Sequence, residues 1–397
     1  MTSEKPQDPM RILIVAGGTG GHIYPGLSLA AALRALAAEK GRQVVIRFVG
    51  TRRGLEERLI PPEGYSLVTL PAAGFPRGKG PRQWPAWLAS LTVNGYTWLR
   101  SLGLVARFRP HVATGMGGYL TGPVLLAAHL LGVPTLVHEA NARPGVANRL
   151  AARFVDQVAV GFEEAARAFP QARSVTVTGN PIRASVLHGD RGRALRRFGL
   201  EAGRPTLLVL GGSQGARAIN EALFAARERL EGAVPGLQVI HQTGAGEFER
   251  VAQRWRSVRM AQVGQGEVRW KGWRVLPYLD PVADCLAAAD LVCSRAGGST
   301  CAELTALGVP ALLIPFAAAT EAHQTENAAA LARAGAARIL PQAELTGERL
   351  AQELAALLTS PSRLQAMREA SRRLGRPEAA RRLAELAWEL AQPGERR

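Results

Sequence analysis

The stretch VAGGTGGHIYP, residues 15–25, places four glycines, a threonine and a histidine directly behind the apolar run RILIV. A glycine-rich turn between a strand and a helix brings backbone N–H groups close to a bound anion. A dinucleotide fingerprint requires glycines at i, i+2 and i+5. Counting from Gly18, this chain has Gly20 and then Ile23, and the next apolar run, VVIRFVG, is followed by TRR instead of an acid. The sequence therefore argues against a nicotinamide-dinucleotide site here.

The same theme returns in residues 205–232, PTLLVLGGSQGARAINEALFAARERLEG. Strand-like runs such as HVATG, PTLVHEA and LVCSRAGG alternate with helix-like segments along the chain. This alternation predicts parallel sheets with helices on both faces. We expect two α/β halves, joined near TGNPIRASV, residues 178–186. Ligands bind at the carboxyl ends of parallel strands, so both glycine loops are expected to open on a cleft between the two sheets.

The composition points to an anionic partner. The 397 residues include 49 Lys and Arg against 32 Asp and Glu, a formal net charge of +17. This charge fits a nucleotide, a nucleic acid or a membrane surface, or reflects codon bias alone. Charge by itself does not choose among them.

Three further features bear on the compartment. The start, MTSEKPQDPM, lacks the apolar core of a secretory signal. Cysteines at 285, 293 and 301 show no paired metal-binding spacing, and reduced thiols in a cytosolic chain are expected. The uncharged stretch 115–137 is broken by glycines and prolines. It predicts a loop, a helix near 122–131 and a strand near 134–138, and not a membrane span.

Two glycine loops in the C-terminal half are candidate anion sites. In LGGSQGARAIN, Ser213 lies among Gly211, Gly212 and Gly215. There a helix N-terminus and a hydroxyl can bind a phosphate, although an ordinary tight turn has the same pattern.

The second loop lies in ADLVCSRAGGSTCAEL, where Arg295 precedes Gly298, Ser299 and Thr300 at a helix start. Glu303, one turn further, can accept both hydroxyls of a ribose or act as a capping-box glutamate. In EAHQTENA, the neutral side chains of His323, Gln324 and Asn327 can hydrogen-bond sugar hydroxyls or form a polar loop.

Polar side chains also follow the predicted strands of the N-terminal half. His22 lies at the tip of the first glycine loop, and the unperturbed pKa of histidine near neutrality suits a general base. VHEAN contributes His138, Glu139 and Asn141, and GMGGYLTGP contributes Tyr119. These clusters predict a second substrate pocket.

The segment 73–109 interleaves basic and aromatic residues: Arg77, Lys79, Arg82, Arg100 and Arg107 with Trp84, Trp87 and Trp98. Such a mixture fits an interface with anionic lipid. A core helix beside a basic loop is the alternative.

Seven motifs occur in a fixed order: GGTGGHIYPGL, GMGGYLTGP, HEANARPGVANR, GNPIR, GGSQGARAIN, HQTG and SRAGGSTCAEL…GVPALLIPF…HQTENA. In this order they resemble the MurG family of bacterial peptidoglycan glycosyltransferases over about residues 11–340. The resemblance implies an α/β GT-B fold of two Rossmann-like domains whose parallel sheets face a central cleft. It places an acceptor and membrane-binding domain at 1–181, a UDP-sugar domain at 182–369, and a C-terminal helix 370–397 that packs back on the first domain.

The resemblance further implies transfer of N-acetylglucosamine from UDP-N-acetylglucosamine to lipid I, forming lipid II. The expected partners are these two substrates and the anionic cytoplasmic membrane surface, contacted through 73–109 by a peripheral enzyme. Contacts with other cell-wall synthesis proteins are compatible with it. No cofactor, metal or nucleic acid is implied.

Residue by residue, the resemblance makes His22 or Glu139 catalytic and assigns Gly18, Tyr119 and Asn141 to the acceptor. It assigns these residues to the donor: Thr19, Gly20, Gly21, Asn141, Arg183, Ser213, Leu279, Arg295, Gly298, Ser299, Thr300, Glu303, His323 and Gln324. Glu303 matches the ribose-binding carboxylate and Leu279 the backbone position that reads uracil. The family's usual HEQN is HEAN here, so Ala140 removes a side-chain amide.

The resulting hypothesis is an inverting, metal-independent transferase. The 4-hydroxyl of the muramyl sugar attacks the anomeric carbon, with His22 as the first choice of base and Glu139 as the alternative. Helix N-termini and Arg295 stabilise the departing diphosphate. The rival hypotheses are a UDP-N-acetylglucosamine epimerase, another glycolipid transferase of the same fold, and a nucleic-acid binder.

Overall fold

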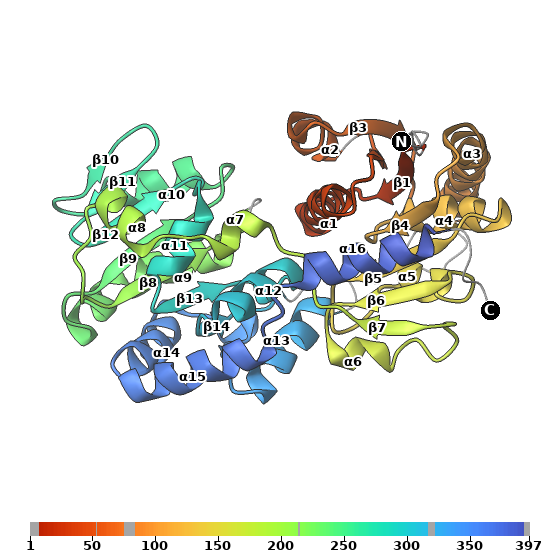
Figure 1. The fold of residues 1–397 in the computed structure, drawn as a ribbon. Coiled ribbons are helices and arrows are strands. Elements are labelled where there is room, and N and C mark those ends of the chain that lie inside the picture. The colour runs from red at the N-terminus through yellow and green to blue at the C-terminus, as the bar shows by residue number, and fades with distance from the viewer. Residues whose placement is uncertain (1–7, 53, 75–83, 213–214, 317–321, 393–397) are drawn as a thin grey trace. The chain divides into compact units, whose positions relative to one another are not determined.

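The computed structural model describes residues 8–52, 54–74, 84–212, 215–316 and 322–392, and the chain forms two compact units (Figure 1). Unit 1 comprises Met1–Arg183 and Glu378–Arg397, and unit 2 comprises Ala184–Pro377. Helix α15 (Pro361–Leu374) belongs to unit 2, and after a break the chain returns to unit 1 in α16 (Ala379–Leu390). Helix α16 packs against α1 (Gly20–Glu39). Unit 1 is therefore built from both ends of the sequence.

The sheet of unit 1 is parallel throughout, in the order β3-β2-β1-β4-β5-β6-β7. Its strands are β1 (Met10–Val15), β2 (Val44–Thr51), β3 (Ser66–Leu70), β4 (Val112–Gly115), β5 (Thr135–Glu139), β6 (Gln157–Val160) and β7 (Val175–Val177). The order reverses between β1 and β4. In an open α/β sheet this reversal opens a crevice at the carboxyl ends of the strands, where ligands bind.

Helices cover both faces of this sheet. Alternate residues of β1 point to opposite faces: Ile12 and Ile14 pack with α1 and α16, while Leu13 and Val15 pack with α3 and α4. The other helices of unit 1 are α2 (Glu56–Leu59), the 3₁₀ helix η1 (Pro61–Glu63), α3 (Trp84–Phe108), α4 (Thr121–Leu130), α5 (Val146–Ala151) and α6 (Glu163–Ala166). Burial on both faces explains why these strands read as continuous apolar runs.

Unit 2 repeats this arrangement with one addition. Its sheet has the order β10-β11-β12-β9-β8-β13-β14-β15, and from β12 to β15 all neighbours are parallel. The strands are β8 (Thr206–Leu210), β9 (Gln238–Gln242), β10 (Gln262–Val263), β11 (Val268–Trp270), β12 (Trp273–Leu276), β13 (Leu291–Ser294), β14 (Ala311–Leu313) and β15 (Ala337–Ile339). β10 and β11 extend the edge in antiparallel fashion. The switch point lies between β8 and β13.

The helices of unit 2 are α7 (Ala184–Leu187), α8 (Arg191–Phe198), α9 (Arg217–Ala233), α10 (Phe248–Trp255), α11 (Val282–Ala288), α12 (Gly298–Leu307), α13 (His323–Arg333), α14 (Gly347–Leu358) and α15, with the 3₁₀ helix η4 (Gln342–Glu344). The core under α9, α10 and α14 includes Trp255, Trp270 and Trp273, whose ring centroids lie 5.4–6.0 Å apart. This aromatic cluster packs the antiparallel edge onto the parallel sheet.

The uncharged stretch 115–137 folds as predicted. It forms the loop after β4, then α4 and the start of β5. In the part of the chain that the structure describes, no helix is long and apolar enough to span a bilayer.

Candidate active site

His22 lies at the switch point of unit 1, in the first turn of α1. Its Nδ1 lies 3.0 Å from the carbonyl oxygen of Gly17. The loop after β4 approaches the other edge of the ring: a Cβ on Gly117 would lie 2.9 Å from His22 Nε2. Gly117 also has φ +101°, which disfavours any side chain. The half-buried imidazole is thus held between two glycine loops.

Glu139, the second candidate base, is buried and accepts four hydrogen bonds. Oε1 accepts from the backbone N–H and the side-chain amide of Asn141 at 2.9 and 3.0 Å. Oε2 accepts from the Gly145 N–H at 3.0 Å and from Asn148 Nδ2 at 2.8 Å. With 3% of its surface exposed, the residue ties the loop 141–148 to the end of β5. Asn148 is a contributor that the sequence analysis missed.

Other predicted residues of unit 1 surround the same carboxyl edge. Tyr119 is 60% exposed, and a Cβ on Gly74 would lie 2.9 Å from its ring. Gly18 and Thr19 are exposed on the loop before α1, with Gly20 and Gly21 in the first turn. The backbone N–H of Gly18 donates to Glu56 at 2.8 Å. That group is therefore already engaged within the protein.

His138 is fully buried beneath this edge. Its Nε2 lies 3.2 Å from the carbonyl oxygen of Gly179, and burial lowers the pKa of the imidazole to about 4. The ring is consequently neutral over the physiological range. At the end of unit 1, the Arg183 guanidinium lies 4.6 Å from the ring centroid of Tyr24 on α1.

In unit 2, the loop between β13 and α12 carries the predicted diphosphate residues. Gly297 precedes the helix and has no side chain with which to cap it, and no acid lies in the first turn. Ser299 Oγ is buried and makes no hydrogen bond to any described residue. A buried, unpaired hydroxyl at a helix N-terminus is placed to donate to an anion. Thr300 and Glu303 follow on the same helix.

Arg295 is the first residue of this loop, and its side chain reaches the end of β14. Its Nη1 donates to the Ile314 and Pro315 carbonyls at 2.9 and 3.3 Å, and its guanidinium lies 5.2 Å from the Phe316 ring centroid. Burial lowers the pKa of the guanidinium from its ordinary value, although the group stays charged at neutral pH. Its positive charge is thus held at the end of β14, while its backbone lies in the loop that leads into α12.

The remaining donor predictions fall around the same sheet edge. Leu279 is buried after β12, so only its backbone can reach a base. His323 begins α13, and Gln324 Oε1 accepts from the Phe316 N–H at 2.9 Å. Asn327, for which the sequence left open a sugar contact or a place in a polar loop, is fully buried and donates to the Ala296 carbonyl at 3.0 Å. Ser213 lies outside the described residues, while Gly212 before it has φ +75°.

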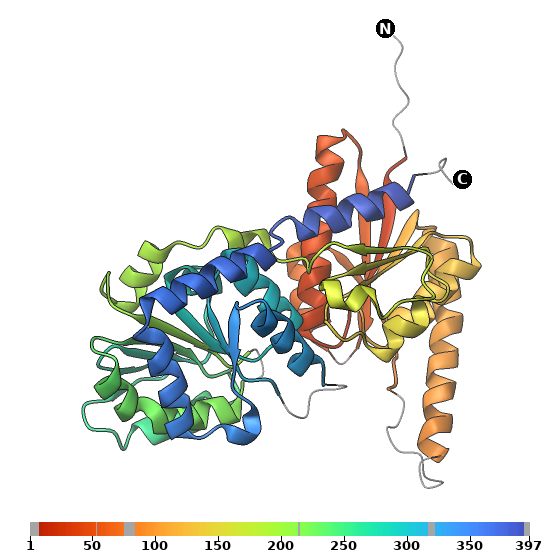
Figure 2. The same cartoon turned by 90° about the horizontal axis from the view of Figure 1, so that it is seen from below.

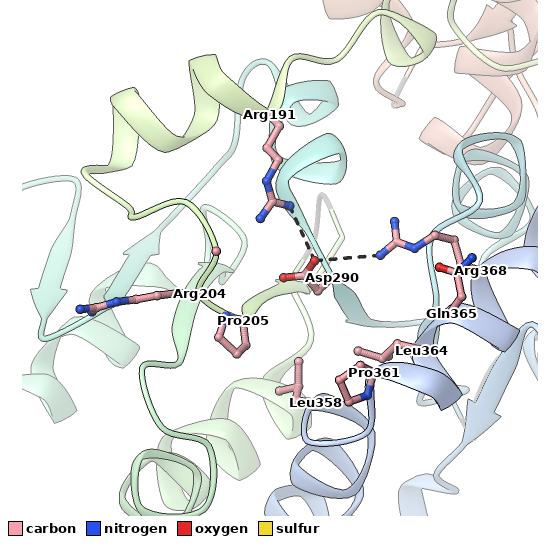
Figure 3. Close-up of a pocket in the computed structure, with 10 residues that line it drawn as sticks. Arg191, Arg204, Pro205, Asp290, Leu358, Pro361, Leu364, Gln365 and Arg368 are labelled. Atoms are coloured by element: carbon pink, nitrogen blue, oxygen red, sulfur yellow. Dashed lines mark ion pairs between the residues drawn. The ribbon is translucent and has the colours of Figure 1, made fainter.

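A cavity of about 290 Å³ lies elsewhere in unit 2 (Figure 3). Asp290 lies 3.6 Å from Arg191 and 4.0 Å from Arg368, while Arg204 extends away from them. Pro205 and Asp290 directly precede β8 and β13, so the cavity is at the amino ends of these strands. The glycine loops follow the carboxyl ends. The cavity is therefore separate from the predicted donor site.

The cysteine thiols and the possible metal ligands add no reactive group to these sites among the described residues. Burial raises the pKa of the Cys285, Cys293 and Cys301 thiols to about 12, so they remain protonated at neutral pH. Among the described residues, no group of three or more His, Cys, Asp or Glu side chains is arranged to hold a metal ion.

Helix α3 extends beyond the rest of unit 1 (Figure 2). Its large apolar side chains face solvent along much of its length. Its exposed large side chains are Trp84, Trp87, Leu88, Leu91, Tyr96 and Leu99. Only Ser90, Thr97, Ser101, Val105 and Phe108 are buried, so the helix is not a core helix along its length. Arg77, Lys79 and Arg82 lie outside the described residues.

Comparison with known proteins agrees with this architecture. Residues 12–160 match the glycosyltransferase family 28 N-terminal domain, and residues 206–383 match its C-terminal domain. The fold and these two domain matches define a glycosyltransferase of the GT-B type.

Similar proteins show which family of GT-B glycosyltransferases the chain belongs to. A UDP-N-acetylglucosamine–N-acetylmuramyl-(pentapeptide) pyrophosphoryl-undecaprenol N-acetylglucosamine transferase from Desulforudis audaxviator is 41% identical, covering 98% of this chain and 100% of the relative. The crystal structure of Acinetobacter baumannii MurG superposes with a TM-score of 0.71 at 28% identity, covering 96% of this chain and 100% of that one. The chain belongs to the family of these N-acetylglucosamine transferases, the MurG family.

Epimerases are also among the solved structures similar to this chain. A UDP-N-acetylglucosamine 2-epimerase superposes with a TM-score of 0.65, covering 98% of this chain and 99% of that one, at 18% identity. At that identity the likeness concerns the fold alone.

Proposed function

We propose that the protein transfers N-acetylglucosamine from UDP-N-acetylglucosamine to the 4-hydroxyl of the muramyl sugar of lipid I, forming lipid II. The observation that carries this proposal is the match of nearly the whole chain, at 41% identity, to a relative whose name specifies this donor and acceptor.

The donor is proposed to bind unit 2 at the carboxyl edge of its sheet. The diphosphate would accept hydrogen bonds from the first turn of α12 and from the unpaired Ser299 hydroxyl. Arg295 would add a fixed positive charge, and Glu303 would accept the ribose hydroxyls. As the glycosidic bond to UDP breaks, negative charge grows on the diphosphate. These preorganised groups would stabilise that charge in the transition state.

His22 is the preferred general base. Because Gly17 O can only accept, neutral His22 must donate from Nδ1, which leaves Nε2 unprotonated and able to take the proton of the attacking hydroxyl. Glu139 is the weaker candidate, since both its oxygens already accept hydrogen bonds that hold the loop 141–148. Inversion follows if the hydroxyl attacks from the face opposite UDP.

The transfer is tested with UDP-N-acetylglucosamine and a short-chain lipid I analogue, with and without a chelator. The proposal expects a disaccharide product and UDP in equal amounts, unaffected by the chelator. Incubation with the donor alone discriminates the epimerase, because only an epimerase forms the epimerised sugar without an acceptor. Epimerised sugar without disaccharide would contradict the proposal.

We also propose that the enzyme acts peripherally at the cytoplasmic face of an anionic membrane, with α3 and the basic segment before it as the contact. The exposed apolar face of α3 and the basic residues of 73–109 supply the two attractions that interfacial binding needs. Each basic residue near an anionic surface is worth about 1 kcal/mol. Reversing Arg77, Lys79 and Arg82 should therefore weaken binding to phosphatidylglycerol-containing vesicles by roughly 100-fold or more.

The matched control reverses Arg229, Arg256 and Arg259, three exposed arginines of unit 2, with the same change in net charge. Equal vesicle binding by the two triple variants would count against a localised contact. Sedimentation with vesicles of graded anionic content measures both.

A further inference from the structure

Glu56 is a fully buried carboxylate beside the first glycine loop, and the transfer chemistry described above does not use it. It begins α2 and has 0% of its surface exposed. Its Oε1 accepts from the Thr51 N–H, the Thr51 hydroxyl and the Gly18 N–H, each at 2.8 Å. Burial opposes its ionisation, yet these hydrogen bonds outweigh burial and hold the pKa of the carboxyl below its usual range.

Three glycines make room for this side chain. A Cβ on Gly54 would lie 1.7 Å from Glu56 Oε2, one on Gly50 2.7 Å from Cγ, and one on Gly17 2.9 Å from Oε1. Each of these glycines flanks a different part of the carboxylate-bearing side chain. The pocket is therefore shaped to keep the carboxylate at the loop.

The hydrogen bond to Gly18 connects Glu56 to His22 through a single peptide group. The N–H of Gly18 and the carbonyl of Gly17 belong to the same peptide unit. On one side that unit donates to Glu56 Oε1 at 2.8 Å, and on the other it accepts from His22 Nδ1 at 3.0 Å. A carboxylate hydrogen-bonded to the N–H polarises the peptide and makes its carbonyl oxygen a stronger acceptor.

We propose that Glu56 is a positioning residue for His22. Through the Gly17–Gly18 peptide it fixes the imidazole with its proton on Nδ1 and its Nε2 lone pair free. The carboxylate does not touch substrate, because it is fully buried within the protein. The tautomer of a histidine is set by the hydrogen bond that its other nitrogen makes, here to a peptide that Glu56 anchors. The predicted effect on turnover rests on the proposed role of His22 as base. The predicted tautomer of His22 does not depend on that role.

The experiment uses the full chain and compares wild type with Glu56→Ala, Glu56→Gln and Gly54→Ala. Nitrogen-15 NMR at alkaline pH reports which ring nitrogen of His22 carries the proton, with His22→Gln identifying its signals. Steady-state kinetics with the lipid I analogue measure kcat and the KM for UDP-N-acetylglucosamine. The glutamine oxygen can still accept from Gly18, whereas alanine cannot, and a methyl group at position 54 pushes the carboxylate away.

Wild type should show the proton on Nδ1. Glu56→Ala should show mixed tautomers and lose about 10- to 100-fold in kcat, with a donor KM changed by less than about twofold. Glu56→Gln should retain the wild-type tautomer and a kcat within about threefold of it, and Gly54→Ala should fall between the two. Recovery in the glutamine variant separates positioning from a general loss of stability.

Asp156→Ala is the matched control. Asp156 Oδ2 accepts from the Thr135 N–H and hydroxyl at 2.9 and 3.0 Å, the same pattern as Glu56 with Thr51, but at the amino end of β5. It should leave the His22 tautomer and kcat unchanged.

A proton on Nε2 in wild type would overturn the proposal, as would a wild-type tautomer in Glu56→Ala. An equal loss of kcat in Asp156→Ala, or no recovery in Glu56→Gln, would also overturn it. If Glu56→Ala does not fold, Gly54→Ala and Glu56→Gln give the same test. Full kcat in His22→Ala would refute the base assignment while the NMR result still decides the positioning.

Discussion

Each unit has a glycine loop at the switch point of its sheet: one precedes α1 in unit 1, and the other precedes α12 in unit 2. The two loops have similar sequences and local folds, but their surroundings differ. In unit 1, the loop after β1 is occupied from within, because its Gly18 N–H donates to the buried Glu56 and its Gly17 carbonyl accepts from His22. Neither α1 nor α12 has a side-chain cap or an acid in its first turn, but the loop before α12 leaves the Ser299 hydroxyl without a partner among the described residues. An internal carboxylate repels a phosphate, whereas an unpaired hydroxyl at a helix start can donate to one. The comparison teaches that side chains behind a Rossmann-type turn determine which ligand it can bind.

The sharpest way to break this comparison is His22→Ala. If the unit 1 loop serves to present a base, kcat should fall by roughly 10²- to 10⁴-fold, the usual range for general base catalysis. The donor KM should change little, because the proposed diphosphate and ribose contacts at Ser299, Arg295 and Glu303 are in unit 2. Steady-state kinetics with the lipid I analogue provide the measurement, and an unchanged kcat would remove His22 from the role of base.

Glu303→Ala addresses the unit 2 side. Losing a charged acceptor for two ribose hydroxyls should raise the donor KM by roughly 10- to 100-fold, with a smaller change in kcat. Glu249→Ala, on an exposed position of α10 in the same unit, is the control. Equal KM values for the two variants would place the ribose elsewhere.

The buried histidines offer a comparison of stability between the units. Burial lowers the pKa of His138 in unit 1 to about 4 and that of His241 in unit 2 to about 3. In the unfolded chain each imidazole binds a proton with a pKa of ~6.5, whereas in the folded chain both imidazoles are still neutral at that pH. Unfolding free energy should therefore fall with decreasing pH below ~6.5, by up to about 1.4 kcal/mol per pH unit for each histidine.

For His138 this loss is complete near pH 4, and for His241 it continues to about pH 3. Urea unfolding at several pH values gives the slope. His138→Gln and His241→Gln should each flatten it by about one proton. A slope that is unchanged in both variants would contradict the assignment of neutral buried rings.

Ser299→Ala should give the smallest effect and the most specific one. Removing one hydrogen-bond donor to the diphosphate should weaken UDP binding by about fivefold, as judged from a net contribution of about 1 kcal/mol. The free protein should lose no thermal stability, because the buried hydroxyl has no partner to lose among the described residues. Calorimetric titration and thermal unfolding measure the two quantities. A parallel loss of both would indicate a structural role.

Much of the fold could be predicted from the sequence because its signals are local. Apolar runs followed by glycine pairs and amphipathic helices predicted two α/β halves, and the breakers within 115–137 predicted the loop, helix and strand observed there. The antiparallel strands β10 and β11 were not predicted. With two and three residues they are too short to show a period, and packing of Trp270 against Trp255 and Trp273 stabilises them.

In the candidate site, too, some residues were identified from the sequence and others only from the structure. Residue types and their order identified His22, Arg295 and Ser299 as candidates, because glycine loops and helix starts are visible in the sequence. Asn327 was a candidate for a sugar contact or for a polar loop, and it is buried against Ala296. Glu139 and Glu56 look alike in sequence, as acids near strand ends. Both belong to unit 1, and each accepts hydrogen bonds from a different loop, which no local sequence pattern reveals.

The sequence alone therefore determined the repeated strand, glycine-loop and helix units, and the family whose motifs they carry. These properties depend on neighbouring residues and on motif order. The tertiary structure alone decided which polar groups are already satisfied. The partners of Gly18 and Asn148 come from other elements, and hydrogen bonds between distant segments depend on how the sheet brings its carboxyl ends together. The role of Glu56 behind His22 became visible only at that level.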